Sequence, residues 1–166
     1  MKMVYRARDH RPVELNALLG LPCTDGGSIV ATGIATDSRR VRPGDVFFAR
    51  AGMNADGRSF ITQAIAAGAV AVVTSPLDVL PNVRVPIFEV ENFSATLGAA
   101  SARLNESPSE ALRLIGVTGT NGKTTVSYLL ASVLEKWGGC GLIGTLGVGR
   151  PGDLAKSGHT TPEVMR

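Results

Sequence analysis

The residues best suited to chemistry form a glycine-rich run at positions 116–125, which reads Gly-Val-Thr-Gly-Thr-Asn-Gly-Lys-Thr-Thr. Glycines let the backbone turn tightly with its N–H groups facing inward, and a following helix adds about half a positive charge at its start. A loop of this kind binds phosphate groups. In such a loop Lys123 reaches the β- and γ-phosphates, and the Thr124 hydroxyl offers Mg²⁺ a hard oxygen ligand. The run therefore predicts a nucleoside triphosphate site.

The glycine spacing of this loop departs from the common pattern. That pattern has a glycine five residues before Gly122, where this chain has Val117, and the glycines fall instead at Gly116 and Gly119. The variant spacing weakens the interpretation as a generic GTPase or kinase. Small GTPases and nucleoside kinases usually begin near their phosphate loop, whereas a whole module precedes this one. The alternative is that the run is a simple strand-to-helix turn with an exposed lysine and binds no phosphate.

The segments around the loop must position it. An apolar segment over 112–117 predicts a strand before the loop, and residues 140–146 predict the next strand. Between them, helical spacing of apolar residues predicts an amphipathic helix that ends at Gly138 and Gly139. Its expected core-facing residues are Val126, Leu129, Leu130, Val133, Leu134 and Trp137. One such unit cannot bury both faces of its sheet, so we expect residues 111–166 to be the truncated start of a phosphate-loop (Walker-type) α/β nucleotide-binding domain, and the chain to be the N-terminal part of a longer protein.

The residues ahead of this domain alternate between strand and helix patterns. Strands are predicted at 29–35, 46–49, 69–73 and 86–90. Two helices are predicted, one opening at Asp56 as its cap and one carrying Phe93, Leu97, Ala100 and Leu104 on one face. Alternating strands and helices predict a largely parallel sheet covered by helices. The polar segment 105–110 marks a boundary. Residues 1–110 are therefore predicted to form a mixed α/β domain.

The composition indicates an ordinary globular protein. Of the 166 residues, 44% are hydrophobic and 19% charged, which argues against a disordered or fibrous chain. Aromatic residues make up 5% and the net charge is +3, so a nucleic-acid partner is not indicated. The longest apolar run, 64–73, is too short to span a bilayer, and Asp9 interrupts any signal-like start. We expect no membrane insertion, a cytoplasmic location, and ordinary reduced thiols at Cys23 and Cys140.

Several motifs together resemble those of the Mur ligases, the ATP-dependent amide ligases of peptidoglycan precursor synthesis. They are Thr-Asp-Ser-Arg at 36–39 with Arg-Pro-Gly-Asp-Val-Phe-Phe-Ala at 42–49, Gly-Met-Asn-Ala-Asp-Gly-Arg at 52–58, the loop at 116–125, Ile-Gly-Thr at 143–145 and His-Thr-Thr-Pro-Glu at 159–163. The resemblance covers nearly the whole chain, from about Leu15 to Glu163. It implies a ligase acting in cell wall biogenesis, and so in cell shape and cell division, with residues 1–110 as a UDP-sugar-binding domain.

Within this family the chain most resembles the members that add the third peptide residue. The D-Ala-D-Ala-adding members usually have Ser in place of Thr120 and lack a Thr-Thr-Pro loop. The resemblance implies that ATP phosphorylates the terminal carboxylate of UDP-N-acetylmuramoyl-L-Ala-D-Glu. The amine of a diamino acid, meso-diaminopimelate or L-Lys, then attacks the acyl phosphate. ATP and Mg²⁺ are the implied cofactors.

The resemblance also implies roles for particular residues. Lys123 is the implied catalytic residue and Thr124 the metal ligand. In the loop near the uracil and diphosphate, His-Gln-Ala is common, so Met53 and Asn54 depart from the family pattern. His159 stands where Asn is common. The implied ATP-binding residues are Gly119, Thr120, Asn121, Gly122, Lys123, Thr124 and Thr125, and the implied substrate-binding residues are Thr36, Ser38, Met53, Asn54, Ala55, His159, Thr160 and Thr161.

Other interpretations of the chain stay open. It could be a D-Ala-D-Ala-adding Mur ligase, a phosphate-loop regulatory NTPase whose first module binds a partner, or a nucleotide-binding module without catalysis. At two positions a plainer role is the alternative: His159 as an exposed loop histidine, and Ser38 as a turn residue that bonds its own backbone. The family's Mg²⁺-binding glutamate, carbamylated lysine and amino-acid-binding domain would lie beyond Arg166. We therefore expect the chain by itself to lack ligase activity.

Overall fold

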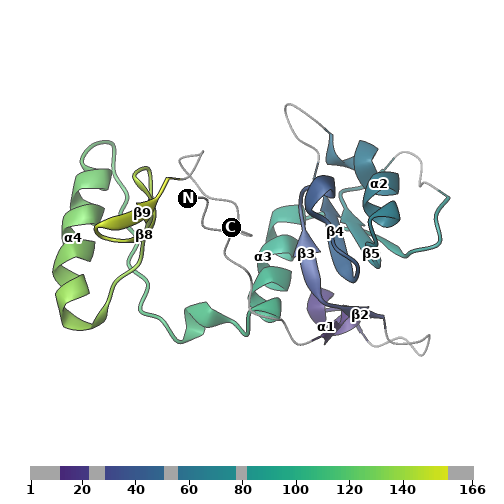
Figure 1. Ribbon diagram of the computed structural model, residues 1–166, viewed down its shortest axis with the longest axis horizontal. Helices are drawn as coiled ribbons and strands as arrows, with labels where there is room; N and C mark the ends of the chain where they lie inside the picture. Colours follow the sequence, from purple (N-terminus) through teal and green to yellow (C-terminus); the bar gives the residue numbers. More distant parts are fainter. Residues whose placement is uncertain (1–11, 23–28, 51–55, 78–81, 157–166) are drawn as a thin grey trace. The chain divides into compact units, whose positions relative to one another are not determined.

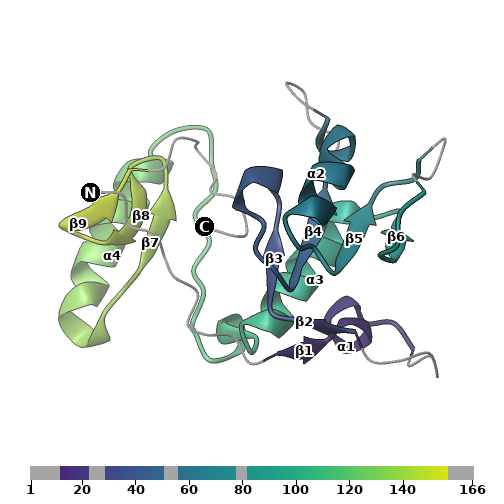
Figure 2. The ribbon, with the colours of Figure 1, turned by 45° about the vertical axis from the view of Figure 1, so that its right-hand side comes forward.

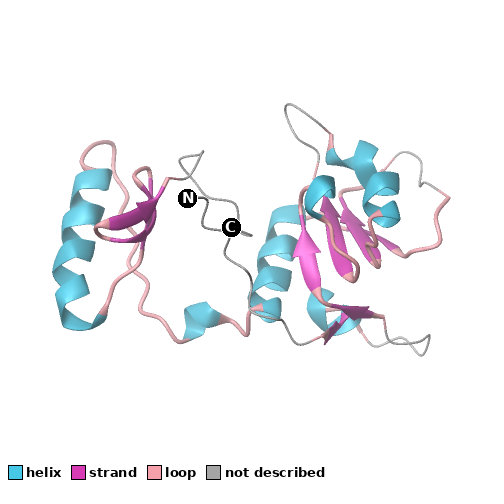
Figure 3. Cartoon of the chain, in the orientation of Figure 1, coloured by secondary structure: helices cyan, strands magenta, loops and turns pink. Residues whose placement is uncertain are grey.

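The computed structural model describes residues 12–22, 29–50, 56–77 and 82–156. The chain divides into two compact units, and the division falls between Ala111 and Leu112. Figure 1 labels their elements, and Figure 3 shows that both units contain helices and strands. The mixed α/β fold class predicted from the sequence is confirmed. No helix in the described ranges is long and apolar enough to cross a membrane.

A four-stranded parallel sheet forms the centre of the first unit. Its strands are β3 (Gly33–Ala35), β4 (Asp45–Ala49), β5 (Ala71–Thr74) and β6 (Ile87–Glu89), and they lie side by side in that order. Val46 pairs with Ala71, and Val72 pairs with Ile87. Every residue of β4 and β5 is buried, as expected for a parallel sheet covered on both faces. The predicted parallel sheet is confirmed.

Helices cover both faces of this sheet. On one face, Phe48 and Val73 pack with α1 (Leu15–Leu19) and α3 (Phe93–Leu104). On the other face, Phe47 and Val72 pack with α2 (Ile61–Ala66), which follows the short 3₁₀ helix η2 (Gly57–Phe60). Successive strand residues point to opposite faces, so this alternation builds two cores from the same two strands. Figure 2 shows α2 and α3 flanking the strands.

The predicted strand over 29–35 is interrupted in the structure. Its first part, β2 (Val30–Ala31), pairs antiparallel with β1 (Val13–Glu14), while β3 joins the parallel sheet. Thr32 lies between them, and its N–H donates to Gly44 O at 2.9 Å. The sequence prediction of one continuous strand was wrong, because an apolar pattern does not reveal that a strand changes partners.

The second unit contains α4 (Lys123–Gly138) and a three-stranded antiparallel sheet. The sheet consists of β7 (Leu142–Gly144), β8 (Gly147–Arg150) and β9 (Asp153–Ala155), in that order. Gly139, with φ of 88°, follows the end of α4, as the glycine pair predicted. A 3₁₀ helix, η3 (Pro108–Glu110), precedes the unit.

Two predictions for the second unit were wrong. Residues 112–117 form no strand, and Leu114 and Ile115 are 73% and 61% exposed. An apolar run becomes a strand only beside a pairing partner, and the strands of this unit pair only among themselves within the part of the chain described. The expected core face of α4 is also uncovered, since Leu129 and Trp137 are 59% and 85% exposed.

Candidate functional site

The glycine-rich loop leads directly into α4, which begins at Lys123. Gly122 precedes the helix with φ of 75° and no side chain caps its N–H groups, while Gly119 has φ of 141°. These left-handed backbone angles explain why glycine occupies both positions. The first helical bond runs from Val126 N to Gly122 O at 2.9 Å. The N–H groups just before it have no acceptor within the helix, and such groups bind phosphate oxygens.

Lys123 turns back over this loop. Its Nζ donates to Gly119 O at 2.5 Å and to Thr120 O at 3.3 Å. The ammonium group is therefore held beside the loop carbonyls, next to the N–H groups of the helix start, although the side chain is exposed. Thr124 lies in the first turn of α4 and is half-buried. The structure thus brings together the residues predicted to bind ATP, 119–125, at the start of one helix.

The chemistry of this loop fits a phosphate group with a magnesium ion. Backbone N–H groups and one ammonium group match phosphate oxygens. Among the residues described, His, Cys, Asp and Glu form no group of three or more that could hold a metal ion. Mg²⁺ commonly keeps several waters and binds phosphate oxygens plus one or two protein oxygens, so a single Thr124 hydroxyl is compatible with it.

The carboxyl ends of the parallel strands gather polar residues in the first unit. Thr36 follows β3 and is half-buried, and Ser38 begins the 3₁₀ helix η1 (Ser38–Arg40) and is buried. Ligands of parallel α/β sheets bind at this edge of the sheet. The family resemblance predicts contact of Thr36 and Ser38 with the uridine nucleotide, and in the structure both residues follow the carboxyl end of β3.

Ser38 does not bond its own backbone, which was the plainer alternative for this residue. Its Oγ donates to Oε1 of Gln63 in α2, at 3.1 Å. The backbone of η1 is capped instead by Asp37, whose Oδ1 accepts from Arg39 N at 3.0 Å. Sequence reasoning missed Gln63, because the bond joins residues 25 positions apart and Gln63 reads as an ordinary exposed helix residue.

Two Asp–Arg pairs, each between residues two positions apart, lie near this edge of the sheet. The Arg39 guanidinium donates to Asp37, and the Arg58 guanidinium donates to Asp56, each with a closest distance of 2.7 Å. These hydrogen bonds lower the pKa of both carboxyl groups, because they favour the charged form. Asp56 also caps η2 by accepting from Arg58 N at 3.0 Å, so the predicted helix cap is confirmed.

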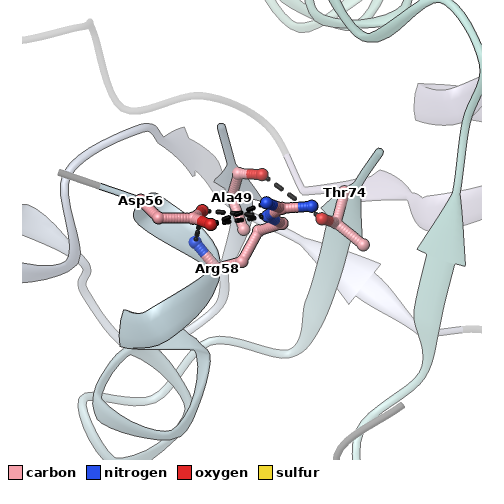
Figure 4. Close-up of polar contacts among 4 residues, drawn as sticks. All are labelled: Ala49, Asp56, Arg58 and Thr74. Atoms are coloured by element: carbon pink, nitrogen blue, oxygen red, sulfur yellow. Dashed lines mark hydrogen bonds and ion pairs between the residues drawn. The ribbon is translucent and has the colours of Figure 1, made fainter. Parts of the chain in front are cut away.

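Arg58 brings the start of η2 to the ends of two strands. Figure 4 shows its side chain extending from Asp56 toward Ala49 and Thr74, the last residues of β4 and β5. Thr74 Oγ1 in turn donates to Ala49 O at 3.3 Å. Arg58 lies in η2, which leads directly into α2, the helix that carries Gln63.

The backbone of Gly57 lies close against that of Arg50. Gly57 N donates to Arg50 O at 2.8 Å, and a Cβ at Gly57 would lie 2.6 Å from that oxygen. Only glycine allows so close an approach. The remaining candidate substrate-binding residues lie outside the described part of the chain. They are Met53, Asn54, Ala55, His159, Thr160 and Thr161.

Two models of known protein families match this chain. The description "Mur ligase family, catalytic domain" matches residues 30–104, and "Mur ligase middle domain" matches residues 117–166. The chain belongs to the Mur ligase family. The resemblance identified from the sequence motifs is therefore confirmed. The first match contains the strand-edge residues Thr36 and Ser38, and the second contains nearly all of the phosphate loop of this Mur ligase chain.

Individual relatives agree with this assignment. A "UDP-N-acetylmuramoyl-L-alanyl-D-glutamate--2,6-diaminopimelate ligase" of Ectopseudomonas mendocina is 45% identical over 160 residues, which cover 93% of this Mur ligase chain and 32% of the relative. The Pseudomonas aeruginosa ligase of the same name is 43% identical over 157 residues, with the same coverage. The chain thus spans about a third of the length of these curated relatives.

Solved structures show the same relationship. A structure of a ligase with that name superposes with a TM-score of 0.73 at 26% identity, covering 93% of this chain and 32% of the other. A D-alanyl-D-alanyl ligase from Acinetobacter baumannii superposes with a TM-score of 0.54 at 24% identity, covering 78% of this chain and 29% of the other. The second likeness shows a shared fold.

Proposed function

We propose that this chain carries the uridine-nucleotide-binding and ATP-binding parts of a ligase that adds a diamino acid to UDP-N-acetylmuramoyl-L-Ala-D-Glu. The observation that carries the proposal is the phosphate loop at the start of α4, in a chain that belongs to the Mur ligase family. The printed names of its relatives favour 2,6-diaminopimelate over L-Lys as the added residue. They also favour the third-residue reaction over D-Ala-D-Ala addition.

Each unit has its own part in this proposal. Residues 1–110 form the UDP-sugar-binding domain, where Thr36, Ser38 and the segment 53–55 bind the uridine nucleotide. Residues 111–166 begin the ATP-binding domain, and 159–161 hold the muramoyl-peptide. The co-substrates are nucleotides of the cell interior, so we place the reaction in the cytoplasm, with no nucleic-acid partner and no membrane insertion.

The proposed chemistry needs crowded negative charge to be neutralised. A carboxylate is a poor electrophile at neutral pH, and its phosphorylation supplies a leaving group that the incoming amine displaces to form an amide. The N–H groups at the start of α4 would orient the ATP phosphates, and the Lys123 ammonium would offset charge on the transferred phosphoryl group. Thr124 would hold Mg²⁺, which supplies further neutralisation when bound.

Calorimetric titration of the purified chain tests the proposal. We expect UDP-N-acetylmuramoyl-L-Ala-D-Glu to bind, and ATP with Mg²⁺ to bind more tightly than GTP. Binding of GTP without any binding of the uridine compound would favour the regulatory NTPase and overturn the proposal. The corresponding uridine tripeptide nucleotide, the substrate of a D-Ala-D-Ala-adding ligase, should bind no more tightly than the dipeptide compound.

A further inference from the structure

The hydrogen bond between Ser38 and Gln63 carries an inference about how the uridine nucleotide is recognised. Ser38 lies at the carboxyl end of β3, and Gln63 lies in α2, which packs against η1. The Ser38 hydroxyl donates to Gln63 Oε1 at 3.1 Å. A serine hydroxyl has one hydrogen and two acceptor lone pairs. Once that hydrogen is directed at Gln63, Ser38 offers a ligand acceptor capacity only.

The neighbouring polar groups are engaged elsewhere. Asp37, next to Ser38, accepts from the backbone and the guanidinium of Arg39. Thr74, at the end of β5, directs its hydroxyl hydrogen to Ala49 O. Ser38 is therefore a neutral acceptor at the edge of the sheet where the uridine nucleotide is proposed to bind.

We propose that Gln63 is a positioning residue that turns the Ser38 hydroxyl into an acceptor for the nucleoside part of the substrate. Phosphate oxygens at neutral pH accept hydrogen bonds, so Ser38 Oγ in this state does not match the diphosphate. Uridine has donors in the uracil N3–H and the ribose hydroxyls, and these match it. This inference rests on the proposed function, because it specifies which part of the uridine nucleotide Ser38 contacts.

Uridine diphosphate and two analogues test this inference on the whole chain. N3-methyl-UDP lacks the base donor, and 2′,3′-dideoxy-UDP lacks both ribose donors. The wild-type chain should bind UDP about tenfold more tightly than one of the two, as expected for one lost hydrogen bond in a buried site. The analogue that binds more weakly identifies the group that donates a hydrogen bond to Ser38. Equal binding of all three compounds would overturn the inference.

Substitutions at Gln63 then test its positioning role. Gln63→Leu removes the acceptor, so the hydroxyl can rotate, and the preference for UDP over the weakened analogue should fall to about twofold or less. Gln63→Glu keeps an acceptor at the same place and should retain the preference. Thr62→Ala, at the exposed neighbouring position of α2, is the matched control and should change nothing. Ser38→Ala should abolish the preference, and adding Gln63→Leu to it should have no further effect.

The outcomes separate this inference from the proposed function. If the wild-type chain binds neither UDP nor the muramoyl-dipeptide nucleotide, the proposed function fails and the inference fails with it. If UDP binds and Gln63→Leu keeps the full preference, the inference alone is overturned, and the bond only ties η1 to α2. Should Gln63→Leu fail to fold, the contrast between Gln63→Glu and Ser38→Ala decides, since loss of the preference in both variants contradicts a hydroxyl that donates to Gln63.

Discussion

At the scale of single residues, the Lys123 ammonium group is held at the loop that we propose to bind the ATP phosphates. Its Nζ contacts the carbonyl oxygens of Gly119 and Thr120, so the ammonium group already lies at the loop before any nucleotide arrives. A long lysine side chain otherwise has many solvated rotamers, and holding it near the site reduces the entropy lost on binding. The loop backbone thus fixes the position of the lysine and, under the proposed function, also supplies the N–H donors for phosphate.

Lys123→Ala should weaken ATP binding without affecting the first unit. Loss of a charged hydrogen-bond partner costs about 1.5–3 kcal/mol, or about tenfold to a hundredfold in affinity. Titration calorimetry with ATP and Mg²⁺ measures the loss. Lys136→Ala, near the other end of α4, removes the same charge away from the loop and should bind ATP normally. Equal affinities for the two variants would contradict the assigned role.

Asp45 gives the stability of the first unit a distinct pH dependence. Its side chain is buried, and burial raises the pKa of the carboxyl group, although Oδ2 accepts from Arg42 N at 2.9 Å. The folded state therefore binds this proton more tightly than the unfolded state does. The Asp45 contribution to the free energy of unfolding should fall as pH rises from the ordinary Asp pKa, about 3.9, through the raised value.

Asp45→Asn should remove this dependence, because an amide does not titrate as a carboxyl group does. The amide oxygen can still accept from Arg42 N, so the hydrogen bond is kept. Urea unfolding between pH 4 and pH 7 should show the wild-type chain losing stability relative to the variant as pH rises.

For Asp37→Asn, the wild-type chain should instead lose stability relative to the variant as pH falls. The Arg39 hydrogen bond lowers the Asp37 pKa, so the stability from that pair is present above the ordinary Asp pKa and is lost as pH falls. The same trend in both variants would contradict the two pKa directions.

At the scale of elements, features set by neighbouring residues could be predicted from the sequence, whereas the pairing of one segment with a distant one could not. The face of α3 and the Asp56 cap follow from spacing within a few residues, and both are confirmed. The strand at 112–117 was wrong, because pairing depends on another segment. The site follows the same rule. The phosphate loop lies in ten consecutive residues, whereas the bond from Ser38 to Gln63 joins two elements that only folding brings together.

The turn after α2 should be sensitive to a single added methyl group. Gly68 has φ of 105°, and a Cβ there would lie 2.8 Å from Pro43 Cα, while Gly68 O accepts from Gly44 N at 3.0 Å. Gly68→Ala should therefore lower the free energy of unfolding by about 1–3 kcal/mol, as expected for a strained backbone position. Urea unfolding followed by circular dichroism measures the change.

Gly98→Ala is the matched control for this substitution. Gly98 lies inside α3, and nothing lies within 4 Å of a Cβ added there. Alanine in a helix interior is favoured over glycine by about 0.5–1 kcal/mol, so this variant should be more stable than the wild-type chain. If both glycine variants changed stability in the same direction, the close approach of Gly68 to Pro43 would not be the cause.

At the scale of the whole chain, the two units differ in how much apolar surface they bury. Both hydrophobic cores of the first unit consist of residues between Val13 and Leu104. The second unit buries Ala131 and Leu142, while large side chains on α4 and the segment before the loop stay exposed. Buried apolar area is the main source of folding free energy, so the first unit should supply most of the cooperative stability.

Removal of residues 112–166 tests this difference. The shortened chain, residues 1–111, keeps every residue of both cores, so its urea midpoint by circular dichroism should match that of the same transition in the whole chain. It should also keep its affinity for UDP, because Thr36, Ser38 and Gln63 all remain. Loss of cooperative unfolding in the shortened chain would show that the first unit depends on residues after Ala111.

Trp137 reports whether the outer face of α4 is covered in the whole chain. It is the single tryptophan of the sequence and is 85% exposed near the end of α4. An indole in water emits at long wavelength, so the native chain should already show water-like emission. Added urea should then shift the emission little, while the circular dichroism of the first unit passes through its transition. Short-wavelength emission that moves to longer wavelength together with that transition would mean that Trp137 is covered and that its unit unfolds with the first.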